Sequence, residues 1–95
     1  MAVQVHIKRK VSEKQVPELE ALLKKLRALT LNRKGYISGR TFNRVDQPGV
    51  SLVIGTWQSA DDWKEWAQSN DRIDLQEKID KLLGQPTEYE IFQSI

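Results

Sequence analysis

The sequence predicts an α+β sandwich whose elements follow the order β-α-β-β-α-β. Four short segments alternate apolar and polar residues, as half-buried strands do. Two longer segments repeat apolar residues every three or four positions, as amphipathic helices do. Right-handed crossovers turn the two βαβ halves into a four-stranded antiparallel sheet with the helices on one face. This is the ferredoxin-like arrangement.

Length and composition favour one small soluble domain over residues 1–95. The chain is 39% hydrophobic and 29% charged, which suits a globular protein rather than a disordered one. No apolar run approaches the roughly 18 residues of a membrane span, and the N-terminus lacks the basic-then-apolar order of a signal peptide. The absence of cysteine excludes disulfides and thiolate chemistry. We therefore expect a cytoplasmic protein without a membrane partner.

Charge is distributed unevenly along the chain. The first 45 residues carry eleven Lys/Arg and three Asp/Glu, whereas the rest carry four and ten. A basic half of this kind is found in proteins that bind nucleic acid or another anion. No glycine-rich phosphate loop or nucleic-acid motif accompanies it, so we expect the two halves to lie side by side and neutralise each other. No nucleic-acid partner is predicted.

Residues 2–11 are predicted to form the first strand. Its apolar face consists of Val3, Val5, Ile7 and Val11. His6 falls on the polar face, where it is either a solvated or interface residue or an acid–base group of a ligand pocket. As the only histidine it excludes a multi-histidine metal site within one chain, and no metal is predicted.

The first helix is predicted to begin near Ser12 and Gln15, which have capping-box spacing, with Pro17 in the first turn. Its apolar stripe consists of Leu19, Leu22, Leu23, Leu26 and Leu29. The helix is expected to end in N-R-K-G (32–35), where a glycine follows basic residues.

A β-hairpin is predicted next. Its strands run from Tyr36 to Val45 and from Val50 to Trp57, joined by a D-Q-P-G turn. Strict alternation in the first of these strands places Tyr36 on the same face as Phe42. The second strand is apolar on both faces, which suits a strand covered on both sides.

The second helical region is predicted in two pieces, roughly 60–68 and 71–83, because S-N-D (69–71) offers a new helix start. The apolar side of the first piece consists of Trp63, Trp66 and Ala67. The apolar side of the second consists of Ile73, Ile79, Leu82 and Leu83. Gly84 is expected to end this helix, and a last strand follows Pro86.

The face of the sheet without helices is predicted to be an interface. Phe42 and one side of the strand 50–57 place apolar groups there. An exposed apolar face of that size is costly unless it has a function. A second copy packed sheet to sheet would cover it, so we expect a homodimer in which two sheets close into an α+β barrel.

Five segments carry a resemblance to a known family. They are G-Y-I-S-G (35–39), D-x-P-G (46–49), L-V-I-G-T-W (52–57), S-A-D-D-W (59–63) and W-A-Q-S (66–69). With the strand and long helix before them, they resemble the antibiotic biosynthesis monooxygenase superfamily of dimeric α+β barrels. The resemblance covers essentially the whole chain. It implies a ligand pocket between the sheet and the helices of each subunit.

The resemblance further implies a cofactor-independent monooxygenase that acts on a small aromatic substrate, such as a phenol, a quinol or a polyketide-like compound. A pocket that stabilises the phenolate in a dry site lets the substrate react with oxygen itself, so no cofactor is predicted. Candidate substrate-binding residues are Tyr36, Trp57, Trp63 and Trp66, and candidate catalytic residues are His6, Asn43 and Arg72.

Each candidate has an assigned role and a structural alternative. The tryptophans would form an aromatic wall, Tyr36 and Asn43 would donate hydrogen bonds, Arg72 would stabilise an anion and His6 would act as base. Tryptophans at helical spacing are also typical of a core, and an arginine near a helix start is typically solvated.

Two other functions remain open. One is a non-catalytic dimeric module that binds a small ligand or serves a stress response. The other is haem binding or degradation. Trp57, Ser59 and Trp66 resemble part of the pattern of the haem-degrading branch of the family. In that pattern an iron-ligating histidine follows ten residues after the last tryptophan, and an asparagine lies on the first strand. Here Gln76 stands at the position of the iron ligand, and the position of the asparagine falls approximately on Ile7, so haem cleavage is not favoured.

Overall fold

A computed structural model describes all 95 residues. Its elements in chain order are β1 (Val3–Lys10), a 3₁₀ helix (Glu13–Gln15), α1 (Val16–Thr30), β2 (Tyr36–Asn43), β3 (Val50–Trp57), α2 (Ala60–Ala67), α3 (Asn70–Leu83) and β4 (Glu88–Gln93). The predicted α+β order is confirmed, including the second helical region in two pieces.

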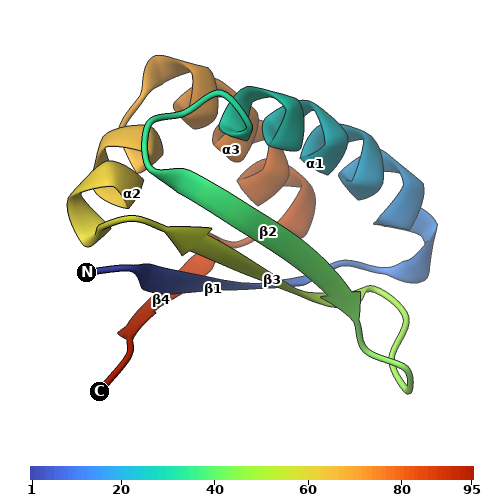
Figure 1. Cartoon of the computed structure of the whole chain (residues 1–95). Coiled ribbons are helices and arrows are strands. Elements are labelled where there is room, and N and C mark those ends of the chain that lie inside the picture. Colours follow the sequence, from blue (N-terminus) through green and yellow to red (C-terminus); the bar gives the residue numbers. More distant parts are fainter.

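The molecule has two layers. One is an antiparallel sheet with the strand order β2-β3-β1-β4. The other consists of the three helices, which all cover the same face of the sheet, with α1 beside α3 (Figure 1). This is the predicted ferredoxin-like arrangement, and it leaves the opposite face of the sheet open.

Side-chain caps separate α2 from α3. The Ser59 hydroxyl accepts the Asp62 N–H at 3.1 Å where α2 begins, and the Ser69 hydroxyl accepts the Arg72 N–H at 3.4 Å where α3 begins. α3 ends at Gly84, whose φ of 75° is the left-handed conformation that favours glycine. Because the chain turns between the two helices, side chains from both reach the space above the sheet.

The core lies between the helices and the sheet. Its ten buried apolar residues are Val3, Val5, Ile7, Val11, Leu19, Leu26, Trp57, Trp63, Trp66 and Ile79. One prediction about α3 is wrong: Ile73 is 39% exposed, and Arg72 and Gln76 are buried instead. These two polar side chains tolerate burial because each forms hydrogen bonds with residues before or on β4.

The predicted face of Tyr36 is also wrong. The pairing of β2 with β3 shifts register between Tyr36 and Ser38, so one extra residue enters the strand. Tyr36 consequently pairs with Trp57 and faces the helices, whereas Phe42 pairs with Leu52 and faces the open side. An extra residue of this kind reverses the faces of all residues on one side of it.

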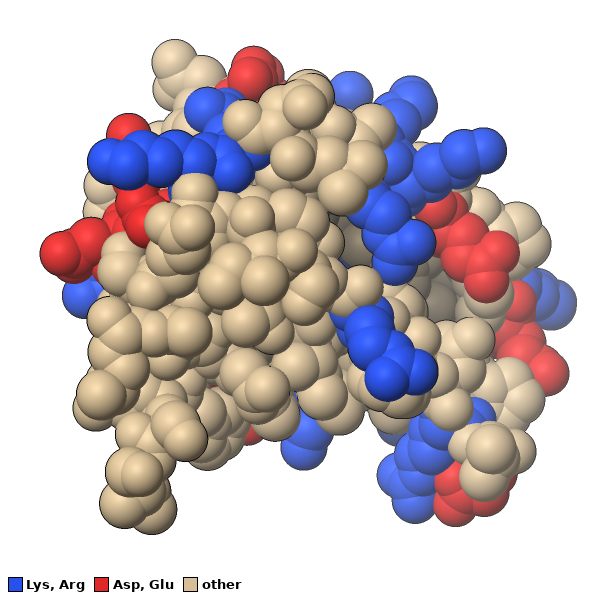
Figure 2. Space-filling model, viewed as in Figure 1, with Lys and Arg blue, Asp and Glu red and all other residues tan.

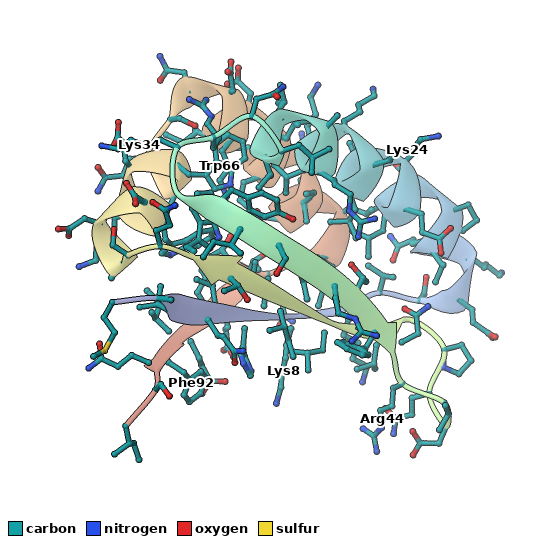
Figure 3. The ribbon with its side chains drawn as sticks, in the orientation of Figure 1. Lys8, Lys24, Lys34, Arg44, Trp66 and Phe92 are labelled. Carbon is teal, nitrogen blue, oxygen red and sulfur yellow. The ribbon has the colours of Figure 1, made fainter.

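The open face of the sheet carries exposed aromatic side chains. Phe42 is 42% exposed and Phe92 is 47% exposed. In Figure 3, Phe92 and Lys8 lie on the side of the sheet opposite the helices, whereas Trp66 lies between helices and sheet. Arg40 lies over the Phe42 ring at 5.1 Å. This face therefore matches the apolar surface expected from the sequence.

The basic and acidic halves meet where α1 and α3 pack together. The ion pair between them is exposed and joins Arg33, just after α1, to Asp71 at the start of α3 at 3.2 Å. The remaining ion pair, between Arg44 and Asp46, is local to the β2–β3 turn.

None of the helices has the length and apolar character needed to cross a membrane.

Candidate functional site

A cavity of about 280 Å³ lies between the helices and the sheet. Residues from β1, β2, β3 and all three helices line it, and half of its 18 lining residues are hydrophobic. α1 and β2 both border it, and the Arg27 guanidinium on α1 donates to the Thr41 hydroxyl on β2 at 3.1 Å. Figure 2 shows a hollow on this side of the molecule, bordered by Lys and Arg side chains.

Aromatic rings form one wall of the cavity. Tyr36 meets Trp57 edge to face with 5.4 Å between ring centroids, and Trp57 meets Trp63 in the same way at 5.8 Å. Trp66 completes the lining, and the Arg33 guanidinium lies 4.7 Å from its ring centroid. Edge-to-face contacts fix ring orientation, so the wall is preformed.

Two glycines form the floor of the cavity. Gly39 on β2 and Gly55 on β3 are directly paired, and both line the cavity. A Cβ at Gly39 would lie 2.7 Å from the Tyr36 hydroxyl, and one at Gly55 would lie 3.4 Å from the Trp57 ring nitrogen. The missing side chains therefore leave space for the two aromatic rings and for a ligand next to them.

Arg72 reaches the cavity from the first turn of α3. It is 4% exposed, and its Nη2 donates to the Tyr89 hydroxyl at 2.5 Å and to the Gln76 carbonyl at 3.2 Å. Its guanidinium also lies 5.0 Å from the ring centroids of Trp63 and Tyr89. These contacts hold a positive charge at the aromatic wall.

Gln76 does not line the cavity. Its amide nitrogen donates to Asp80 and to Thr87, each at 2.7 Å, while its carbonyl accepts from Arg72. Both ends of the amide are thus engaged in a buried network between α3 and the start of β4. The residue at the position of the haem ligand therefore has a structural role, and no three His, Asp or Glu side chains gather to hold a metal.

Arg9 is a cavity residue that the sequence analysis did not identify. It lies on the helix-covered face of β1 in phase with Val5 and Ile7, and it is 3% exposed. Its Nε and Nη2 have no hydrogen-bond partner within the protein. Burial lowers the pKa of Arg9 to about 10, and the nearby Arg72 charge also lowers it, whereas Tyr89 and Asp80 act in the opposite direction. The guanidinium remains protonated at neutral pH.

The strand pattern could have revealed Arg9. In the alternation of Val3, Val5, Ile7 and Val11, position 9 is the only member of the apolar face that is charged. Its neighbours Lys8 and Lys10 fall on the polar face, so the basic run K-R-K (8–10) obscures the position of Arg9. A charge in the apolar phase of a strand is the signal that was missed.

The other predicted site residues lie elsewhere. His6 is on the open face, where its ring packs against Phe92 with 4.7 Å between centroids. Asn43, at the end of β2, lines a second hollow next to the cavity. The two hollows share Glu20, Leu23 and Thr41 as lining residues. The structure thus brings together five of the seven predicted site residues, namely Tyr36, Trp57, Trp63, Trp66 and Arg72.

Comparison with known proteins identifies relatives of this fold. The family described as antibiotic biosynthesis monooxygenase matches residues 2–78. A conserved protein from Methanosarcina mazei Go1 aligns with 100% of this chain and 94% of its own, with a TM-score of 0.91 and 21% identity. Protein Rv0793 from Mycobacterium tuberculosis gives 0.87 and 18%, over 100% and 96% of the two chains.

SnoaB from Streptomyces nogalater, described as a cofactor-independent oxygenase, aligns over 99% of this chain and 93% of its own, with a TM-score of 0.86 and 14% identity. At identities this low the structural likeness establishes the fold alone. Among curated protein sequences, none matches this chain.

Proposed function

Because this chain belongs to the antibiotic biosynthesis monooxygenase family, we propose that it is a cofactor-independent monooxygenase whose substrate is a small aromatic molecule bound in the cavity. The observation that carries the proposal is the composition of the cavity. A preformed wall of Tyr36, Trp57, Trp63 and Trp66 meets the buried guanidinium of Arg72. An apolar site with a few convergent polar groups is what a flat, ionisable ligand requires.

The proposed reaction depends mainly on the chemistry of the substrate. A phenol that has lost its proton is electron-rich enough to donate electrons to molecular oxygen. One oxygen atom then enters the substrate and the other leaves as water, so the electrons come from the substrate itself. The task of the protein is to bind the anionic form, to hold the ring and to exclude water.

The residues of the cavity support these three tasks. Arg72 is fixed by Tyr89 and Gln76, so its positive charge is held at the cavity wall, where it would stabilise a phenolate. Trp57 and Trp63 offer ring faces and edges for stacking. The cavity of about 280 Å³ exceeds the roughly 150 Å³ that accommodates benzene, so one substituted ring or two fused rings would fit.

A second function is favoured by one specific observation. The only carboxylate that lines the cavity is Glu20, which is exposed, and His6 lies on the other face of the sheet. A buried general base is therefore not among the lining residues. This favours a non-catalytic ligand-binding module, unless the substrate enters as its anion.

Oxygen uptake distinguishes the two functions. We expect uptake with at least one member of a panel of phenols, quinols and hydroxylated naphthalenes. Trp66→Phe should reduce kcat/KM at least fivefold, because it removes part of the wall while keeping an aromatic core residue. Arg44→Met, a substitution in the β2–β3 turn at a residue that does not line the cavity, is the matched control and should leave uptake unchanged. Saturable binding without uptake by any compound would support the module.

We further propose that the working form is a cytoplasmic homodimer joined through the open face of the sheet. Phe42 and Phe92 supply exposed apolar area there, flanked by charged side chains such as Lys8. A second copy would cover both aromatic residues at once. Sedimentation at micromolar concentration should give the mass of two chains, and a monomer would refute this proposal.

A further inference from the structure

The position of Arg9 is unusual for a charged residue. Arginine side chains are almost never fully buried without a partner, yet this one is 3% exposed between β1 and the helices. Two of its three nitrogens, Nε and Nη2, find no acceptor within the protein. A buried charge without a partner is unfavourable, so the side chain destabilises the fold that contains it.

No acidic side chain compensates the charge. The two ion pairs of the protein, Arg33–Asp71 and Arg44–Asp46, involve neither Arg9 nor Arg72. Asp80 is the carboxylate whose charge raises the pKa of Arg9, and it forms no ion pair with the guanidinium. One of its oxygens already accepts three hydrogen bonds, from Gln76 and from the backbone and hydroxyl of Thr87.

The two buried arginines, Arg9 and Arg72, belong to the same cavity. Both line the cavity, and their charges are close enough for Arg72 to lower the pKa of Arg9. Arg72 is held by Tyr89 and Gln76, whereas the donors of Arg9 are free. Two like charges in an apolar cavity repel each other, and a bound anion would relieve both the repulsion and the unmade hydrogen bonds.

We propose that Arg9, together with Arg72, forms an oxyanion subsite in the cavity, and that the natural ligand is an aromatic molecule carrying a carboxylate or a phosphate group. This inference rests on the proposed function for the aromatic part of the ligand. The planar guanidinium of Arg9 has its free Nε and Nη2 on one edge, the geometry that pairs with two oxygens of one group. The tryptophan wall would then hold the ring.

The subsite adds a specificity that the aromatic wall does not supply. Stacking accepts any flat ring of suitable size, whereas an unpaired buried charge favours ligands that bring the missing negative charge. A neutral phenol would leave Arg9 unpaired, as it is without ligand. Anionic ligands should therefore bind more tightly than neutral ligands of the same shape.

Isothermal titration calorimetry of the full chain tests the subsite directly. The probes are 1-hydroxy-2-naphthoate, 1-naphthyl phosphate and neutral 1-naphthol, which share a ring system and differ in charge. We expect at least one anion to bind about tenfold more tightly than 1-naphthol, as charge-assisted hydrogen bonds imply. The carboxylate and phosphate arms show which of the two groups the subsite takes.

Three variants assign the preference to Arg9. Arg9→Met should abolish the preference for the anion while leaving the affinity for 1-naphthol within about threefold, because the wall is untouched. Arg9→Lys keeps the charge and should retain part of the preference. Arg44→Met, an exposed arginine outside the cavity, should retain all of it.

Two results would overturn the subsite. One is that neither anion binds more tightly than 1-naphthol, and the other is that the preference persists in Arg9→Met. Both results are independent of the proposed enzyme activity. Failure of oxygen uptake with ligands that bind in a charge-dependent way would refute the monooxygenase and leave the subsite standing.

Discussion

Replacing Arg9 with methionine is expected to stabilise the ligand-free protein. The pKa of this buried guanidinium is lowered from its ordinary value to about 10, chiefly because burial removes it from water. A pKa that is lowered in the folded state means that the protonated side chain favours the unfolded chain. Each pKa unit corresponds to about 1.4 kcal/mol, so the charge costs about 3 kcal/mol at neutral pH.

Methionine fills similar space without a charge or a hydrogen-bonding group. We therefore expect Arg9→Met to raise the free energy of unfolding by about 2 to 3 kcal/mol. In a domain of this size that gain raises Tm by roughly 10 °C or more. Thermal and urea unfolding at pH 7, followed by circular dichroism at one fixed protein concentration, measure both quantities.

The control is Arg44→Met, which removes an exposed arginine and its local ion pair with Asp46. It should change the free energy of unfolding by no more than about 0.5 kcal/mol. If Arg9→Met left Tm unchanged or lowered it, the guanidinium would have to be paired or hydrated in solution. That result would refute the reasoning from its burial.

Three other predictions concern pH, the cavity floor and the open face. The Tm difference between Arg9→Met and wild type should be full below pH 10 and should narrow as the pH rises above 10, because the folded protein releases the Arg9 proton before the unfolded chain does; a difference in Tm that stays constant above pH 10 contradicts this. Gly55→Val should fill the cavity floor beside Trp57 and abolish binding of 1-naphthol in calorimetry, with the circular dichroism spectrum of the fold retained; unchanged affinity would place the ligand elsewhere. Phe92→Lys should convert a dimer to a monomer in sedimentation velocity, because it places a charge in the proposed interface; an unchanged sedimentation coefficient argues for another interface.

The elements around the hairpin were predictable from sequence because their boundaries have strong local signals. β3 runs from Val50 to Trp57 as predicted, since a Pro-Gly turn precedes it and the Ser59 cap follows it. Gly84 ends α3 for the same kind of reason. Such signals act through a few neighbouring residues, so they survive without knowledge of the tertiary structure.

The errors arose where the tertiary structure decides. The extra residue between Tyr36 and Ser38 carries no sequence signal of its own, yet it turns Tyr36 toward the cavity. Arg72 and Gln76 take the buried side of α3 because Tyr89 and Thr87 lie opposite them with matching hydrogen-bonding groups. Periodicity locates the apolar face of a helix, but it carries no information about hydrogen-bonding partners in other elements.

The aromatic part of the site was predictable from the sequence, whereas the prediction of its charged part was incomplete. Clustering of Trp57, Trp63 and Trp66 along a strand and the next helix already placed three rings at one end of the sheet. Arg9 was missed because a single arginine within a basic run reads as solvated. His6 was proposed as a base, but the side of β1 it occupies places it away from the cavity.

The arrangement of the tryptophans has a practical consequence. The chain contains three, and all three line the same cavity. The indole emission of the folded protein therefore originates entirely from the wall of the candidate site. Any ligand that stacks there alters that emission without a label. Occupancy of the site, and its loss on unfolding, can thus be followed optically in the unmodified protein.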